Sequence, residues 1–211
     1  MPRKFRRQIK RWRKSKKLRL YTAVGLICIA ALSYAVYMDA RKLSVDPSSY
    51  KPLLDLIASV ESKGNYNAHF GNPTNSDIKF TAMTLDEVQQ WQRDFVAQGN
   101  ASSAVGRYQF IDSTLSGLIA ELNLDGTQKF DEATQDKFAV ALLERRGSVK
   151  YINQELTPEE FAANLAMEWA ALPKIIGENS NASYYADDGL NSALVRKDTV
   201  LQAVQHIRPL Q

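Results

Sequence analysis

The sequence predicts a mainly helical globular domain, with at most a small sheet, that follows a single transmembrane helix near the N-terminus. Three observations support this fold class. An uncharged run, residues 20–38, comes directly after a strongly basic arm. Beyond it, apolar residues recur every three or four positions in five or six segments, which is the spacing of amphipathic helices. The long alternating segments that are typical of strands do not occur there.

The basic arm and the uncharged run together predict a membrane anchor. Residues 1–19 hold 11 of the 27 lysines and arginines and no acidic residue, which leaves 16 basic residues against all 23 acidic ones. A helix over the nineteen residues 20–38 is about 28 Å long, close to the roughly 30 Å of a hydrocarbon core. Because basic flanks stay in the cytoplasm, we expect the arm inside and residues 39–211 in the periplasm, beyond the inner membrane.

Two other interpretations of this region stay open. A cleaved signal peptide has the same basic and then apolar order, but its apolar part is usually shorter, and Tyr37-Met38-Asp39-Ala40 is a poor small-residue cleavage site. An arm that binds nucleic acid would use the same charges, with Phe5 and Trp12 between them. Attraction to anionic lipid already accounts for the charges, so the expected partner is inner-membrane lipid and not nucleic acid.

Metal and thiol chemistry are not expected in the exported part. The only cysteine, Cys28, lies in the uncharged run, so residues 39–211 have neither a disulfide nor a thiol nucleophile. The two histidines, His69 and His206, are far apart and have no cysteine partner, which argues against a zinc site. We therefore expect no metal and no cofactor.

A polar linker, residues 39–49, is expected to lead into the folded domain, residues 50–211. Its proline and its pair of serines are typical of a linker. Ser49 is the expected N-cap of the first helix, and Pro52 falls in the first turn, where a missing N–H costs nothing.

The first helix ends in a glutamate that has an unusual position. Leu54, Ile57 and Ala58 lie on one helical face, and Glu61 is next on that face, shortly before a glycine and a loop. The carboxyl group is therefore expected on the buried side, where desolvation raises its pKa and keeps it protonated near neutral pH. Cleavage of a glycosidic bond needs such a group as its general acid. The alternative is an ordinary solvated glutamate in a last helical turn.

Capping signals mark two of the later helices. Thr84 with Glu87 has the spacing of a capping box, and the helix that it opens is expected to end near Gly99. Thr157 with Glu160 is a second capping box, with proline at the first helical position. This second helix is rich in alanine and is expected to continue to the proline at residue 173, at the centre of the domain.

Other segments complete the expected domain. A helix that opens at residues 130–131 is expected to stop at Gly147, and the two arginines before this glycine suit the helix dipole. A last helix places Val200, Leu201 and Val204 on one face. Polar stretches at 64–79 and 174–189 are expected to be loops.

Five short motifs occur in a fixed order along this domain. They are Glu61-Ser62 with Gly64, Ala104-Val105-Gly106-Arg107-Tyr108-Gln109, Phe130-Asp131 with Gln135-Asp136, Glu144-Arg145-Arg146-Gly147, and Glu168-Trp169-Ala170-Ala171-Leu172-Pro173. With these motifs the chain resembles the lysozyme-like superfamily, and within it the phage lambda-type endolysins, which are peptidoglycan lytic transglycosylases. The likeness runs from about residue 53 to residue 185.

The resemblance implies an α+β lysozyme-like fold and a site that binds peptidoglycan glycan strands. It implies that Glu61 is the catalytic acid. The substrate-binding residues that it implies are Ser62, Arg107, Tyr108, Gln109 and Tyr185, with Tyr184 as the alternative to Tyr185. The chain departs from the family pattern in its long loop at 174–189 and in its expected anchor. The anchor suggests an envelope enzyme that acts locally.

The residues themselves give no convincing second catalytic carboxylate. The acids nearest in sequence to the expected cleft lie in loops or helix starts, where capping explains them: Asp77, Asp86, Asp94 and Asp112. One glutamate suffices if it protonates the leaving oxygen and then takes a proton from a hydroxyl of the same sugar, which closes an anhydro ring. A membrane-anchored lytic transglycosylase is therefore expected. The alternatives are a hydrolytic lysozyme of the same fold and an inactive peptidoglycan-binding module of an envelope secretion apparatus.

Overall fold

A computed structural model describes residues 43–210 of the chain, which belong to one compact unit that begins at Leu43. The expected basic arm (1–19) and transmembrane helix (20–38) lie outside the described residues. Within 43–210, every helix is too short or too polar to cross a bilayer.

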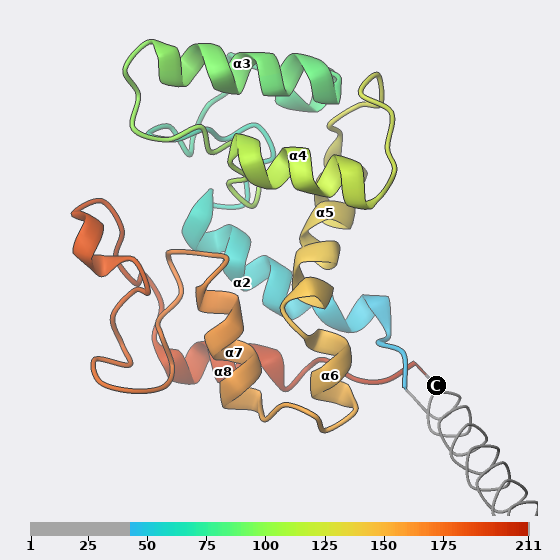
Figure 1. Ribbon diagram of the computed structural model, residues 1–211, viewed down its shortest axis with the longest axis vertical. Helices are drawn as coiled ribbons and strands as arrows, with labels where there is room; N and C mark the ends of the chain where they lie inside the picture. Colours follow the sequence, from blue (N-terminus) through green and yellow to red (C-terminus); the bar gives the residue numbers. More distant parts are fainter. Residues whose placement is uncertain (1–42, 211) are drawn as a thin grey trace, which may run out of the picture. The chain divides into compact units, whose positions relative to one another are not determined.

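The folded unit is mainly helical, as the sequence predicts (Figure 1). Residues 43–210 contain isolated β-bridges and no longer strand. The helices, with η marking 3₁₀-helices, are η1 (Pro47–Tyr50), α2 (Lys51–Glu61), η2 (Phe80–Ala82), α3 (Leu85–Ala97), α4 (Asp112–Glu121), α5 (Glu132–Arg145), α6 (Ser148–Ile152), α7 (Pro158–Ala166), η3 (Ala186–Asp188) and α8 (Lys197–Val204).

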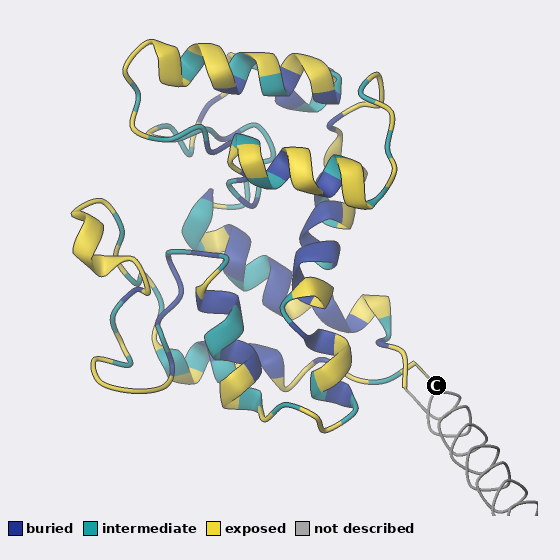
Figure 2. Cartoon of the chain, in the orientation of Figure 1, coloured by how far each residue is buried: buried dark blue, intermediate teal, exposed yellow. Residues whose placement is uncertain are grey.

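The helices pack in two groups. Helix α3 packs on α4 at one end of the unit, while α2 and α7 both pack on α8 at the other (Figure 1). The buried residues form one hydrophobic cluster that extends through both groups, shown in dark blue in Figure 2. Its largest members have almost no exposed surface and include Leu53, Ile57, Phe110, Phe138 and Phe161.

Both predicted capping boxes are confirmed. The Glu87 amide donates to the Thr84 hydroxyl and the Thr84 amide donates to the Glu87 carboxylate, at 3.2 and 2.7 Å. Thr157 and Glu160 repeat the arrangement at the start of α7, at 3.1 and 2.8 Å. The predicted stop at Gly147 is confirmed too, because this glycine adopts a φ of 107°, which suits residues without a side chain.

The segment expected to be a linker is part of the folded unit from residue 43 onward. Val45 is buried and forms a β-bridge with Pro209. On either side of this bridge the Asp46 amide donates to the Arg208 carbonyl at 2.9 Å, and the Leu210 amide donates to the Ser44 carbonyl at 2.7 Å. The start of the unit is therefore paired with its last residues, which local sequence does not reveal.

Ser49 does not cap α2, so this prediction is wrong. The Ser49 hydroxyl donates to the Asp46 carbonyl at 2.6 Å within η1, and Tyr50 takes the cap position of α2 without a side-chain bond. Asp46 is the N-cap of η1, the helix that precedes α2, because its carboxylate accepts from the Ser48 amide at 2.9 Å. Pro52 lies in the first turn of α2, as predicted.

The alanine-rich helix also ends earlier than predicted, at Ala166. The amides of Glu168 and Trp169 both donate to the Leu165 carbonyl, at 2.9 and 3.0 Å, which tightens the chain into a turn. The Trp169 side chain is buried and its Nε1 donates to the Tyr108 carbonyl at 3.2 Å. The chain leaves the helix here, and residues 168–171 form a wall of the site described below.

Candidate active site

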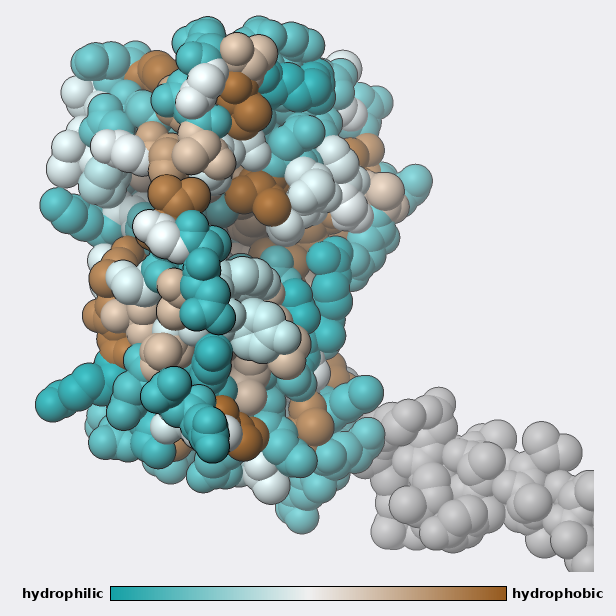
Figure 3. All heavy atoms as spheres, turned by 60° about the vertical axis from the view of Figure 1, so that its left-hand side comes forward, coloured by the Kyte–Doolittle hydropathy of each residue, from teal (hydrophilic) through white to brown (hydrophobic). Residues whose placement is uncertain are grey.

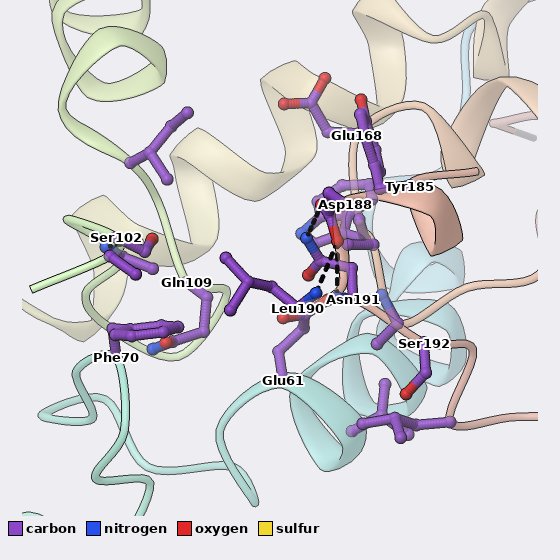
Figure 4. Close-up of a pocket in the computed structure, with 18 of the residues that line it drawn as sticks. Glu61, Phe70, Ser102, Gln109, Glu168, Tyr185, Asp188, Leu190, Asn191 and Ser192 are labelled. Carbon is purple, nitrogen blue, oxygen red and sulfur yellow. Dashed lines mark hydrogen bonds between the residues drawn. The ribbon is translucent and has the colours of Figure 1, made fainter. Parts of the chain in front are cut away.

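A pocket of about 580 Å³ lies beside the C-terminal end of α2. The face of the molecule that is turned forward in Figure 3 is hollowed at mid-height. The hollow lies between the upper part, which holds α3 and α4, and the lower part, which holds α7 and α8. The pocket is lined by Glu61, by parts of residues 70–71 and 101–111, and by parts of 168–171 and 185–194. In Figure 4, Phe70, Ser102 and Gln109 lie on one side of Glu61, and Glu168 and Tyr185 lie on the other.

Glu61 is the last residue of α2, and its side chain lines this pocket (Figure 4). Burial raises the pKa of Glu61 to about 7, against the effect of the Ala171 amide, which donates to its Oε1 at 3.4 Å and lowers the pKa. The expectation of a raised pKa is therefore confirmed. A carboxyl group with a pKa near 7 can donate a proton and take one back at neutral pH.

The backbone after Glu61 fixes the end of α2. The amides of Ser62 and Gly64 both donate to the Ala58 carbonyl, each at 3.0 Å. Ser62 is fully buried, and its hydroxyl donates to the Arg107 carbonyl at 2.7 Å. Ser62 does not line the pocket; it ties the end of the helix that holds Glu61 to the loop that holds Gln109.

Gln109 is the residue of the predicted Arg107-Tyr108-Gln109 segment that lines the pocket. It sits in a tight turn that is closed by paired backbone bonds between Val105 and Phe110, at 3.0 and 2.9 Å. Gln109 adopts a φ of 53°, which is uncommon for residues other than glycine. Its Nε2 donates to the Gly106 carbonyl at 2.9 Å, which holds the amide on the pocket wall.

Arg107 and Tyr108 do not line the pocket, which differs from the expected arrangement. Arg107 Nη2 lies 2.7 Å from an oxygen of Asp55 on α2, and its guanidinium carbon is 4.9 Å from the centre of the Tyr66 ring. Tyr108 is buried and donates to Asp136 on α5 at 2.7 Å, and Tyr66 donates to the same carboxylate at 3.0 Å. These contacts hold the turn that contains Gln109 against α2 and α5.

Tyr185 lines the pocket and Tyr184 does not, which favours Tyr185 as the predicted substrate-binding tyrosine. The Tyr185 hydroxyl donates to the Met167 carbonyl at 2.7 Å. This bond fixes Tyr185 on the same wall as Glu168 (Figure 4).

Two further carboxylates line the pocket that sequence reasoning missed as site residues. Glu168 accepts a hydrogen bond from Arg146 Nε at 2.8 Å and forms an ion pair with Arg146 Nη2 at 2.7 Å. Asp188 accepts from the Asn191 side chain at 2.6 Å and from the amides of Leu190 and Asn191 at 2.8 and 2.9 Å, and these bonds lower its pKa. The Asp188-Gly189-Leu190-Asn191 segment has the composition of a turn, and this composition is the sequence feature that could have pointed to Asp188.

The aspartates considered from the sequence lie elsewhere. None of Asp77, Asp86, Asp94 and Asp112 lines the pocket. Asp86 and Asp112 lie in the first turns of α3 and α4, where acidic residues suit the helix dipole. Within residues 43–210, side chains that commonly bind metals form no group of three or more that would hold an ion.

Comparison with known proteins identifies a family for this chain. The family model described as Endolysin matches residues 51–191, a range that includes α2, the turn with Gln109 and the wall with Tyr185. No curated protein and no solved structure matches the chain. The family match covers most of the chain, and endolysins degrade peptidoglycan. The chain therefore belongs to the endolysin family and is a peptidoglycan-cleaving enzyme.

Proposed function

We propose that the enzyme is a lytic transglycosylase. It cleaves the β-1,4 bond between N-acetylmuramic acid and N-acetylglucosamine and leaves a 1,6-anhydro sugar. One observation carries the proposal: Glu61 is the pocket-lining carboxyl group of residues 43–210 that has a raised pKa and no cationic partner. Glu168 is paired with Arg146, and Asp188 is engaged in its own turn. The pocket therefore supports a mechanism with one acid, which later acts as the base.

In the first step, protonated Glu61 donates its proton to the glycosidic oxygen, and the bond from that oxygen to C1 of the muramic acid breaks. The Ala171 amide then stabilises the carboxylate that forms on Glu61. In the second step, this carboxylate takes the proton of the C6 hydroxyl of the same sugar while O6 bonds to C1. Glu61 ends protonated, so the cycle needs no water and no second carboxylate.

The pocket walls supply the contacts to the sugar. Gln109 and Tyr185 present an amide and an aromatic ring from opposite sides of Glu61, a combination that suits an acetamido group and a sugar face (Figure 4). The predicted roles of Ser62, Arg107 and Tyr108 become indirect in this proposal. They hold Glu61 and Gln109 in place by the bonds described above.

A hydrolytic lysozyme is the second candidate, and Asp188 is the observation that favours it. An ionised carboxylate on the wall of the same pocket could activate a water molecule or stabilise the sugar cation. The three bonds that Asp188 accepts from its own turn argue against this role, because they occupy most of the lone pairs of the carboxylate and lower its pKa, which makes it a weaker base.

Digestion of purified peptidoglycan in ¹⁸O-labelled water tests the proposal. The full-length enzyme should release muropeptides that are lighter by one water than lysozyme products, lack a reducing end and carry no label. Labelled reducing ends would establish hydrolysis. Binding to peptidoglycan without cleavage would indicate an inactive scaffold. The Glu61→Gln variant is the control for contaminating activity.

We also propose that residues 20–38 anchor the enzyme in the inner membrane, with the folded unit in the periplasm. The support is the charge pattern: the first 19 residues are strongly basic and without acidic residues, and the run that follows is uncharged. An anchored enzyme would cleave only the glycan strands near its tether.

A further inference from the structure

A second cavity, of about 440 Å³, adjoins the active-site pocket. The two share Leu194, which lines both. The second cavity is further lined by Asn181 and by the start of α8, including Arg196, Lys197 and Asp198. Glu61, Gln109 and Tyr185 do not line it, so the mechanism proposed above leaves it without a role.

The shared wall is held at a fixed place relative to the catalytic acid. The Ala171 amide donates to Glu61 at 3.4 Å, and the Ala171 carbonyl accepts from the Leu194 amide at 2.8 Å. One residue thus connects the acid to the wall between the two cavities. Arg196 follows Leu194 by two positions, which limits the separation of their Cα atoms to about 7.6 Å.

The charges of the second cavity are available to a ligand. Among residues 43–210, no acidic partner lies within ion-pair distance of Arg196 or Lys197, and no side-chain hydrogen bond involves Asp198. Two cations therefore stand beside one carboxylate, next to the apolar surface of Leu194 and Val195. This set of groups differs from the active-site pocket, where the carboxylates Glu168 and Asp188 already have partners.

A ligand that matches this cavity carries carboxylates, an amine and small apolar groups. A glycan strand does not, because its sugars present mainly hydroxyl and acetamido groups. The stem peptide of peptidoglycan does: it has free carboxylates, alanine methyl groups and a diamino acid. It is attached to the muramic acid whose bond Glu61 would cleave. Four extended residues reach up to about 14 Å. Leu194, which lines both cavities, is linked to Glu61 through two hydrogen bonds of Ala171, so the second cavity lies on the side of the pocket toward which such a peptide could extend.

We propose that the second cavity binds the stem peptide during cleavage, with Arg196 and Lys197 on its carboxylates and Asp198 on the amine of its diamino acid. This inference rests on the proposed function, since it takes peptidoglycan as the substrate of the adjoining pocket. It makes the enzyme selective for glycan strands that still carry peptides.

The first test compares two substrates: intact peptidoglycan and the same glycan after an amidase has removed its peptides. For the full-length enzyme, kcat/KM should be higher on the intact substrate. The double variant R196Q/K197Q should lose about three- to ten-fold on the intact substrate, mainly through KM, because each exposed charge contact contributes modestly. It should lose nothing on the peptide-free glycan. Salt should weaken the preference of the unmodified enzyme in the same direction.

The matched control is K79Q/K150Q, which removes the same charge at exposed lysines that line neither cavity. It should keep the preference for the intact substrate. An equal loss for both double variants, an equal loss on both substrates, or no preference in the unmodified enzyme would overturn the proposal.

A binding measurement keeps this inference separate from the catalytic proposal. Ligand-detected NMR with a free stem tetrapeptide should show binding to the full-length Glu61→Gln variant and about three- to ten-fold weaker binding when R196Q/K197Q is added. Binding that is unaffected by the double variant would overturn the peptide site. Hydrolytic products in labelled water would overturn the transglycosylase proposal and leave the peptide site standing.

Discussion

Replacing Glu61 by glutamine should slow cleavage strongly and make the folded unit more stable at neutral pH. Burial raises the pKa of Glu61 from 4.5 to about 7. A difference of about 2.5 in pKa corresponds to about 3.5 kcal/mol, at about 1.4 kcal/mol per pKa unit. Glu61 keeps part of its surface in contact with solvent, which reduces the stability effect to at most about 3 kcal/mol.

The sign of the effect follows from proton binding in the two states. Below pH 4.5 the carboxyl group is protonated in both the folded and the unfolded chain, so its ionisation has no influence. Between pH 4.5 and about 7 the unfolded chain releases the proton while the folded chain keeps it, and the free energy of unfolding falls as the pH rises. Above pH 7 the loss is complete and constant. The glutamine variant has no such loss.

The free energies of unfolding of the two proteins should therefore diverge between pH 4.5 and pH 8, by at most about 3 kcal/mol in favour of Glu61→Gln. Urea unfolding of the full-length proteins in detergent, followed by tryptophan fluorescence at several pH values, measures this difference. Cleavage should fall by about 10²–10⁴-fold in the variant. The control is Glu178→Gln, at an exposed glutamate outside the pocket, which should change neither quantity.

Three outcomes would contradict this reasoning about Glu61. A difference in stability that does not change with pH would mean that the carboxyl group is not held in its protonated form. A variant that unfolds more easily at pH 8 would assign Glu61 a structural role. Retained cleavage would place the acid elsewhere.

Three further predictions concern other parts of the chain. Asp188→Asn should keep kcat/KM on peptidoglycan within about three-fold if the enzyme has one acid, whereas a loss beyond about 100-fold would favour hydrolysis with Asp188 as the second carboxylate. Gly106→Ala should lower the free energy of unfolding by about 2–4 kcal/mol in urea, because its φ is +79° and a Cβ atom would overlap the Gln135 side chain. Gly64→Ala has a similar φ without the overlap and should cost about 1 kcal/mol; equal effects would refute the steric argument. A reporter enzyme that is active only in the periplasm, fused after Gln211, should be active in cells; activity of a cytoplasmic reporter there would exclude the proposed orientation.

Local signals predicted the helices and the catalytic candidate. The capping boxes and the stop at Gly147 depend on residues within one turn of each other, so the sequence contains all the information they need. The placement of Glu61 follows in the same way, because the helical period that buries Ile57 and Ala58 also directs the next residue on that face inward.

The composition of the pocket walls depends on contacts between distant segments. Arg146 and Glu168 lie 22 positions apart, and the sequence gives no sign that they pair. The Arg107-Tyr108-Gln109 segment shows a second limit. Its three residues are adjacent, but the tight turn directs Tyr108 into the core and Gln109 to the pocket. A motif therefore identified the segment that forms the site without telling which of its side chains face the substrate.

The pairing of the first and last residues of the folded unit has a mechanical consequence. The backbone bonds on either side of the Val45–Pro209 bridge, together with the Asp46–Arg208 ion pair, clasp the point where the chain enters the unit. A pull on the preceding chain would load these bonds before it reached α2. Force applied through the chain before Leu43 would thus open the clasp first, and Glu61, at the far end of α2, would keep its place.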